Sequence, residues 1–356
     1  MSTIPLNLGQ LRGELRSQLQ ARHLCRVGDT LELLAHGEAN LIFRLNDDRL
    51  VRLAVNSPNQ RFAGDASQVS AFEEAILRYL QGTGLSHELI GAQLQPSADF
   101  PYTYLLTNYI PGVPLDYGRK HLQQCAETLA RLHRLPLQAN CHVHQLIPPL
   151  QRVSHPLTLF FQESLDYARP YLNSPKADPK IVAMLEALLA KAEARLSAEK
   201  LLSEYPYGCL VHSDHTYENW VINEHSAYLI DWEWAEVGSP AGDLGHFLSP
   251  VTVCRRHGYQ MPPEDKQFFL TAYYQALGDR TLAETIRVHF AVFGAFPALR
   301  SLCWTAGYWI TANRWYAASI TESTSAAARM ERLRSSQQTF PQMWAEVMAL
   351  LEEPLP

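Results

Sequence analysis

The segment from Leu210 to Phe247 holds two acidic side chains and one amide side chain at a defined spacing. It contains the pattern H-x-D-x-x-x-x-N, in which Asp214 and Asn219 are the aspartate and the asparagine. A second aspartate, Asp231, ends an apolar run that predicts a β-strand. A loop that carries Asp214 and Asn219 is thus followed by a strand that ends in Asp231. This pattern predicts one site built from two carboxylates and a carboxamide.

These three groups suit the transfer of a phosphoryl group from ATP to an alcohol. The attacking hydroxyl needs a carboxylate to orient it and take its proton, and we assign this catalytic role to Asp214. The carboxamide oxygen of Asn219 and the carboxylate of Asp231 are hard ligands that suit Mg²⁺ on the triphosphate. Taken singly, each has an ordinary structural explanation as a turn cap, a loop amide or a surface acid. All three at this spacing favour the functional interpretation.

The composition excludes several classes of protein. The chain has 356 residues, enough for two lobes, and a net charge of -6, so a general affinity for nucleic acid is not expected. Six scattered cysteines without a C-x-x-C pair are typical of reduced thiols in the cytosol. The N-terminus lacks the features of a signal peptide, and the apolar stretch 291–304 is interrupted by Pro297 and Arg300. We therefore expect a cytoplasmic protein with neither a nucleic-acid nor a membrane partner.

The hydrophobic pattern divides the chain into a strand-rich first part and a helical second part. Helices are expected at 8–24 and 66–80, and strands at 31–36, 41–45, 50–55, 87–94 and 102–110. After Pro-Gly-Val-Pro at 111–114, helices are expected at 117–134, 157–170, 179–197, 262–277, 281–301, 303–318 and 339–352. We place an N-terminal nucleotide-binding lobe at 1–107, a hinge at 108–114, and a C-terminal catalytic and substrate-binding lobe at 115–356.

With these motifs the chain resembles the aminoglycoside phosphotransferase and choline kinase superfamily, which has a protein-kinase-like fold. The similarity covers roughly residues 31–247 and is strongest at HSDHTYEN and IDWEWAEVGSPAGDL. The sequence LLTNYIPGVPL resembles the hinge of that superfamily, and ETLARLHRL resembles the helix after it. The resemblance implies an α+β, bilobal protein-kinase-like fold with a small β-rich N-lobe and a large, mainly helical C-lobe.

The loop around Asp214 departs from the superfamily pattern. Ser213 occupies the usual glycine position, which raises the question of whether the backbone there needs a positive φ, a conformation that serine tolerates poorly. Residues 215–218 replace the common Leu-His-Pro-Gly. The resemblance implies that His212 braces the loop by hydrogen bonding and that Asp243 is a structural acid that fixes the C-lobe.

The resemblance also implies where the nucleotide contacts the N-lobe. Gly37 and Asn40 lie between two predicted strands, where a phosphate-covering loop belongs, although a single glycine equally suits a hairpin turn. Arg52 occupies the position of the lysine on the third strand, and arginine can also bind the α- and β-phosphates. Its expected partner is Glu73, with Glu74 as the second choice.

The hinge is expected to bind the base through its backbone. The carbonyl of Asn108 and the amide of Ile110 would face the purine edge. Asp231-Trp232-Glu233 stands where a protein kinase carries D-F-G, but no A-P-E and no activation segment follow. The sequence therefore argues against an ordinary protein kinase.

The whole sequence predicts an ATP-dependent small-molecule kinase, a phosphotransferase with an alcohol group as acceptor. The alcohol could be aminoglycoside-, choline- or thiamine-like, and a cationic compound suits the mildly acidic chain. Trp304, Tyr308 and Trp315 fall on one helical face and could surround a cation, although such a stripe is more often core. The alternative is a nucleotide-binding pseudokinase or regulatory protein of the same fold, favoured by the single-glycine loop and Arg52. The substrate, the choice of ATP or GTP and the oligomeric state are left open.

Overall fold

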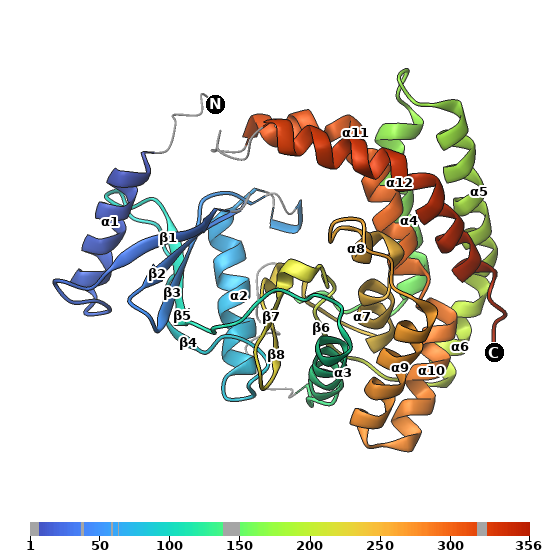
Figure 1. Cartoon of the computed structure of the whole chain (residues 1–356), viewed down its shortest axis with the longest axis horizontal. Helices are drawn as coiled ribbons and strands as arrows, with labels where there is room; N and C mark the ends of the chain where they lie inside the picture. The colour runs from blue at the N-terminus through green and yellow to red at the C-terminus, as the bar shows by residue number, and fades with distance from the viewer. Residues whose placement is uncertain (1–6, 37–38, 58–59, 63, 138–149, 319–325) are drawn as a thin grey trace.

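The computed structural model describes the chain except for residues 1–6, 37–38, 58–59, 63, 138–149 and 319–325. Its first part is built on a five-stranded antiparallel sheet with the strand order β1-β2-β3-β5-β4 (Figure 1). The strands are β1 (Leu31–His36), β2 (Asn40–Leu45), β3 (Arg49–Ala54), β4 (Leu89–Gln93) and β5 (Thr103–Asn108). The predicted strands of the first part are therefore all present.

Helices α1 (Leu8–Ala21) and α2 (Ala66–Leu80) pack on the two faces of this sheet. On β3, Val51 and Leu53 join the core that contains the leucines of α1. Successive side chains of a strand point to opposite faces, so Arg52 between them lies on the α2 side. The alternation of the strand thus directs Arg52 away from the core under α1 and toward the second part of the chain.

The second part is mainly helical, as the sequence predicts. Its helices are α3 (Arg119–His133), α4 (Pro156–Leu172), α5 (Pro179–Arg195), α6 (Glu199–Glu204), α7 (Pro240–Phe247), α8 (Pro250–Cys254), α9 (Pro263–Leu277), α10 (Arg280–Phe293), α11 (Phe296–Ala318) and α12 (Ala326–Glu352). In Figure 1, α5 lies on the side of the molecule farthest from α1, and the long helices α11 and α12 run along the upper edge. The predicted α+β, bilobal arrangement is confirmed.

Two small antiparallel sheets lie between the helices of the second part. β6 (Cys209–Val211) pairs with β9 (Glu236–Gly238), and β7 (Trp220–Ile222) pairs with β8 (Ala227–Leu229). Short 3₁₀ turns, η4 (Tyr217–Asn219) and η5 (Trp232–Trp234), precede β7 and follow β8. Asn219 lies on η4, while Asp214 lies between β6 and η4, and Asp231 lies between β8 and η5.

The two parts of the chain meet at β8 and η5. The Leu229 amide donates to the Leu85 carbonyl at 2.9 Å. The indole nitrogen of Trp232 donates to the hydroxyl of Ser86 at 2.9 Å, and that hydroxyl donates to the Leu229 carbonyl at 2.7 Å. One hydrophobic core contains residues from α2, α3, β7, β8 and α9. The parts are therefore joined by a shared core as well as by polar contacts.

The largest differences from the helix prediction are at the start of α11 and the start of α12. The expected break near residue 302 is wrong, because α10 ends at Phe293 and α11 begins at Phe296. Pro297 lies in the first turn of α11, where proline is favoured because its missing N–H would have no helical acceptor. A Cβ on Gly245 would lie 2.3 Å from the Gly294 carbonyl oxygen, so α7 approaches the chain closely at this break. The last helix also begins earlier than expected, at Ala326.

The apolar composition of α10 and α11 has a structural explanation. The stretch Arg280–Thr311 has the length and mean hydropathy (1.2) of a helix that could cross a membrane, and 61% of its most apolar part is buried inside the protein. At Gly307, α11 approaches α4 so closely that a Cβ would lie 2.0 Å from the Tyr167 carbonyl oxygen. Helix packing within the protein thus uses much of this apolar surface.

Candidate active site

The loop of residues 212–219 leaves β6 and is held by one buried carboxylate. Asp243, on α7, accepts the backbone N–H of His212 at 3.0 Å and that of Ser213 at 2.8 Å. Ser213 has φ of +65°, so the positive φ considered from the sequence is present at this serine. Because the left-handed conformation costs a non-glycine residue roughly 1 kcal/mol or more, the bonds to Asp243 must hold the backbone in it.

Asp243 has two further partners, and both are histidines. His133 Nε2 lies 3.1 Å from Oδ2, and His215 Nε2 lies 2.9 Å from Oδ1. All three side chains are buried. Burial alone would raise the pKa of Asp243, but His215 and His133 hold that pKa well below its usual range. An ionised Asp243 therefore anchors the 212–219 loop to α3 and α7, which agrees with a structural role.

Asp214 contacts Asn219 within the same loop. Asn219 Nδ2 donates to Asp214 Oδ2 at 2.8 Å and to the Asp214 carbonyl at 3.0 Å. Since Nδ2 is committed to Asp214, the carboxamide oxygen of Asn219 is the atom left for a metal ion. Burial raises the pKa of Asp214, Arg255 opposes that rise, and the charge of Asp231 adds to it. The Asp214 side chain is still 27% exposed, so a substrate can reach it.

Asp231 lies directly before η5 and is tied to the same loop. It has a left-handed backbone, with φ of +69°, and its carboxylate accepts from Arg52 Nη2 at 2.5 Å. The preceding residue, Ile230, donates its N–H to the Asn219 carbonyl at 3.0 Å. His212 Nε2 lies 2.9 Å from the Ile230 carbonyl. Burial lowers the pKa of His212 to about 4, so its neutral ring braces the site.

Arg52 connects this site to α2. Its Nη2 lies 3.2 Å from Glu73 Oε1, and Glu73 also accepts the backbone N–H of Trp232 at 3.1 Å. Burial alone would lower the pKa of Arg52, but its carboxylate partners raise it. Burial raises the pKa of Glu73 to about 7, against the effect of Arg52. Glu74, the second choice from the sequence, pairs with Arg78 instead.

The predicted phosphate loop is described in part. With its carboxamide oxygen turned toward the guanidinium, Asn40 accepts from Arg52 Nε at 3.3 Å and from Nη2 at 3.0 Å. Gly37 lies outside the described residues. The structure therefore brings one of the two predicted loop residues to Arg52.

The hinge carbonyl is already used inside the protein. The Asn108 carbonyl oxygen lies 2.9 Å from His87 Nδ1, and burial lowers the pKa of His87 to about 4, so the neutral ring donates from Nδ1. The side-chain oxygen of Asn108 accepts the Glu88 N–H at 2.7 Å. Among the described residues the Ile110 amide donates to no acceptor. Of the two predicted base contacts, the Ile110 amide is thus open and the Asn108 carbonyl is shared with His87.

Asn219 and Asp231 fit a bound Mg²⁺ ion. Within the described ranges no group of three or more His, Cys, Asp and Glu side chains is arranged to hold a metal. Mg²⁺ needs fewer protein ligands, because it usually binds one or two carboxylates together with phosphates and water. Both residues offer oxygen atoms, and a cation here would offset the repulsion between Asp231 and Asp214.

Two buried glutamates add acidic groups close to this site. Burial raises the pKa of Glu233, on η5, well above its usual value, and raises the pKa of Glu236, on β9, to about 7. Arg300 opposes the shift at Glu236 and is itself paired with Glu163 at 3.0 Å. From its place in Asp231-Trp232-Glu233, the sequence predicts that Glu233 could support the metal site or the substrate. Glu163, Glu236 and Arg300 were not predicted as part of the site.

Sequence reasoning also missed a histidine beside Asp214. His246 Nδ1 accepts the backbone N–H of His215 at 3.0 Å, and its Nε2 lies 3.9 Å from Asp214 Oδ1. His246 follows Asp243 by three residues on α7, so both project from the same helical face. That i, i+3 spacing was the available signal, because it pairs a histidine with the acid expected to hold the loop.

The aromatic face predicted on α11 is described in part. Trp304 is 38% exposed and stacks on Tyr308, with ring centroids 4.8 Å apart and an interplanar angle of 13°. The side chain of Trp315 lies outside the described residues. A stacked pair of one exposed and one half-buried aromatic ring is therefore present on α11.

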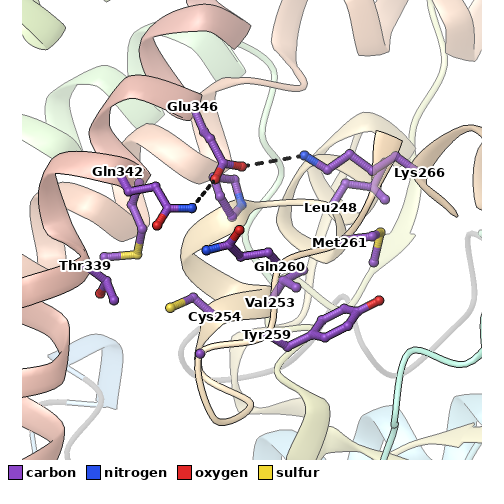
Figure 2. A pocket seen from close by; sticks show the side chains of 13 residues that line it. Leu248, Val253, Cys254, Tyr259, Gln260, Met261, Lys266, Thr339, Gln342 and Glu346 are labelled. Atoms are coloured by element: carbon purple, nitrogen blue, oxygen red, sulfur yellow. Dashed lines mark hydrogen bonds and ion pairs between the residues drawn. The ribbon is translucent and has the colours of Figure 1, made fainter. Parts of the chain in front are cut away.

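The cavity drawn in Figure 2 belongs to another region of the protein. It lies between α12 and the loop that follows α8, and the Lys266–Glu346 ion pair and the side chains of Cys254 and Gln342 line it. Its volume is about 20 Å³, which is room for roughly one water molecule. The cavity is too small to hold a nucleotide or an organic acceptor.

A family model described as the phosphotransferase enzyme family matches residues 30–285. The match covers most of the chain and includes every residue predicted for the site. The chain belongs to the phosphotransferase enzyme family. This membership confirms the resemblance seen in the sequence and the prediction of a phosphotransferase. A comparison with curated protein sequences finds no match.

Three solved structures are similar to this phosphotransferase. A choline/ethanolamine kinase family protein from Mesorhizobium loti is 18% identical, with a TM-score of 0.58 and 97% of this chain and 96% of that chain covered. A putative aminoglycoside phosphotransferase from Ralstonia eutropha is 13% identical, with a TM-score of 0.63 and coverage of 95% and 98%. A spectinomycin phosphotransferase solved with ADP and spectinomycin is 14% identical, with a TM-score of 0.56 and coverage of 99% and 100%. At these identities the likeness establishes the fold, which is the protein-kinase-like fold expected.

Proposed function

We propose that this phosphotransferase moves the γ-phosphoryl group of ATP to a hydroxyl group of a small molecule. The observation that carries the proposal is the pairing of Asp214 with Asn219 directly beside Asp231. Phosphoryl transfer needs little covalent chemistry from the protein, so positioning and electrostatics supply most of the catalysis. Positioning and electrostatics can both come from three side chains here. These are the partly exposed carboxylate of Asp214, the amide of Asn219 and the carboxylate of Asp231, which is tied to the same loop.

Asp214 is the proposed proton acceptor. The acceptor oxygen attacks the γ-phosphorus, its proton passes to Asp214, and the bond from the γ-phosphorus to the bridging oxygen breaks to release ADP. The raised pKa of Asp214 favours its accepting that proton. When bound by Asn219 and Asp231, Mg²⁺ would neutralise charge on the phosphate oxygens.

The nucleotide is proposed to bind between the sheet and the 212–219 loop. Arg52, held by Glu73, lies at Asp231 and offers a guanidinium group to the phosphates. The open amide of Ile110 offers a donor to the base. The similar spectinomycin phosphotransferase was solved with ADP, which supports the proposal that this chain binds a nucleotide.

A cationic alcohol is the proposed acceptor. The carboxyl groups of Asp214 and Asp231 lie close enough to interact, so the site presents two acidic groups to a substrate. A substrate amine would be attracted to this region. The names of the similar structures, which cover choline or ethanolamine and aminoglycosides, support the same class. A thiamine-like alcohol also fits it.

The proposal predicts the behaviour of Asp214→Asn. Purified protein is incubated with Mg·ATP and one of choline, ethanolamine, thiamine, gentamicin, streptomycin or spectinomycin, and phosphorylated product is measured by mass spectrometry. We expect Asp214→Asn to lower kcat by about 10²–10⁴-fold, because the attacking hydroxyl loses its proton acceptor. The affinity for ATP should stay within about 3-fold, since the amide keeps the shape of the side chain.

Asp47→Asn is the matched control, because the Asp47 side chain is 97% exposed in the turn after β2 and pairs with Arg44. It should leave turnover unchanged. An Asp214→Asn variant with full activity would remove Asp214 from the mechanism. Saturable ATP binding without turnover of any acceptor would instead support the nucleotide-binding pseudokinase.

A further inference from the structure

His246 is fixed beside Asp214 by the same helix that holds the loop. Its side chain is 10% exposed, and its Nδ1 accepts the backbone N–H of His215 at 3.0 Å. One turn earlier on α7, Asp243 accepts the backbone N–H groups of residues 212 and 213. Helix α7 therefore holds the backbone on both sides of Asp214, and the position of the His246 ring is part of that arrangement.

The bond to His215 determines which ring nitrogen of His246 carries the proton. Nδ1 accepts a hydrogen bond, so it is unprotonated and the ring proton is on Nε2. Burial, followed by the nearby His215 and Arg300, holds the pKa of His246 well below its usual range. Asp243 acts against this shift and Arg255 adds to it. His246 is thus a neutral ring that offers an N–H at Nε2.

The Nε2–H group of His246 has no acceptor among the described residues. Asp214 Oδ1 lies 3.9 Å from Nε2, which is too far for a direct hydrogen bond. The other carboxylate oxygen of Asp214, Oδ2, is already bound by Asn219. A single oxygen atom about 2.8 Å from both Nε2 and Oδ1 would satisfy both groups, with an angle of about 90° at that oxygen.

We propose that this oxygen is the hydroxyl of the acceptor and that His246 donates a hydrogen bond to it. The proposal rests on the phosphoryl transfer proposed above. The hydroxyl then donates its proton to Asp214 and accepts Nε2–H with one lone pair, so that one lone pair remains to attack the γ-phosphorus. As the new P–O bond forms and the bond to ADP breaks, the hydroxyl proton passes to Asp214, and His246 keeps its own proton.

This arrangement also selects which group of an amino alcohol reaches Asp214. A carboxylate alone would attract the ammonium group at least as well as the hydroxyl. An ammonium group has no lone pair to accept Nε2–H, so at this position it would face an N–H without a hydrogen bond. His246 would therefore direct the hydroxyl, and not the amine, to the reacting position.

Two substitutions of His246 separate this role from a purely structural one. His246→Asn keeps an acceptor near the position of Nδ1 for the His215 N–H but removes the donor at Nε2. His246→Gln places an N–H donor near the position of Nε2 but removes the acceptor at Nδ1. The acceptor is the alcohol from the six-compound panel that gives the highest turnover.

We expect His246→Asn to lower kcat by about 10- to 100-fold, with the KM for ATP changed by less than about 2-fold and a melting temperature close to that of the wild type. His246→Gln should keep more of kcat than His246→Asn, although it loses the bond to the loop and melts at a lower temperature. The proposal would be overturned if His246→Asn kept the kcat of the wild type while His246→Gln lowered both kcat and the melting temperature.

A crystal structure with ADP and Mg²⁺ tests the same inference without turnover. In the wild type we expect an ordered oxygen, from water or alcohol, within about 3.2 Å of both His246 Nε2 and Asp214 Oδ1. A ring that contacts Asp214 directly, with no oxygen between them, would overturn it. If no alcohol of the panel is phosphorylated, the proposed function fails, and the position of this oxygen still decides the role of His246.

Discussion

Ser213 shows how one buried acid can impose a conformation that the local sequence disfavours. The residue has φ of +65° because its N–H is bound by Asp243, a residue 30 positions away in the sequence. A glycine would adopt this conformation without strain. The hydrogen bonds that anchor the Asp214 loop to Asp243 therefore offset the conformational free energy that Ser213 loses in the left-handed conformation.

Ser213→Gly is expected to raise the free energy of unfolding by about 1 kcal/mol, because it relieves the left-handed strain. Ser213→Ala is the matched control, since alanine loses the hydroxyl but keeps the strain, and it should give no such gain. Urea unfolding followed by circular dichroism measures both. Equal stabilities of the two variants would show that the backbone is not strained at this position.

Glu236 gives a prediction on pH. Its folded pKa is about 7, above the ordinary value of 4.5, because burial disfavours its charge. The unfolded chain releases this proton at lower pH than the folded protein, so the stability that Glu236 contributes below pH 4.5 is lost as pH rises toward 7. Glu236→Gln cannot titrate, and its stability relative to the wild type should grow by up to roughly 3 kcal/mol between pH 4.5 and pH 8. Urea unfolding at several pH values measures the difference, and a constant difference would contradict the shift.

At the scale of elements, helices with a periodic apolar pattern could be predicted from the sequence. Breaks between helices that depend on close backbone packing could not. α2 spans the residues predicted, because its apolar face must cover the sheet. The break between α10 and α11 depends instead on a backbone contact between Gly245 and Gly294, which no local pattern reveals. Pro297, which the prediction placed inside a helix at 281–301, lies in the first turn of α11.

The crossing of α11 and α4 gives the prediction at this scale. Gly307→Ala should lower the free energy of unfolding by about 2 kcal/mol or more, because its Cβ would lie 2.0 Å from the Tyr167 carbonyl oxygen. Gly13→Ala, also in a helix but with nothing within 4 Å of its Cβ, should raise it by about 0.5–1 kcal/mol. Thermal unfolding of the two variants measures both changes in the free energy of unfolding. A Gly307→Ala variant as stable as the wild type would mean that the helices can move apart without cost.

At the scale of the whole molecule, the sequence located the centre of the candidate site and, through the resemblance, its supports His212 and Asp243, but not the distant residues that those supports contact. Asp214, Asn219 and Asp231 lie within 18 residues, so their spacing is visible in the chain. The contact of Arg52 with Asp231 spans 179 residues and was not predicted, because the resemblance implied only Glu73 or Glu74 as the partner of Arg52. The bonds of Asp243 to His133 and of Asn108 to His87 depend on tertiary packing, which one sequence does not encode in any local pattern.

The hydrogen bonds of Trp232 to the first part of the chain make its fluorescence a natural probe of motion between the two parts. Its indole N–H is bonded to Ser86 of the first part of the chain, while its backbone N–H is bonded to Glu73. Every tryptophan of the chain lies at or after Trp220, so the sheet and its two helices contribute no tryptophan emission. Among these fluorophores, Trp232 is hydrogen-bonded across the junction where the nucleotide is proposed to bind. A movement of the two parts relative to one another would therefore alter its emission, and the motion could be followed without any added dye.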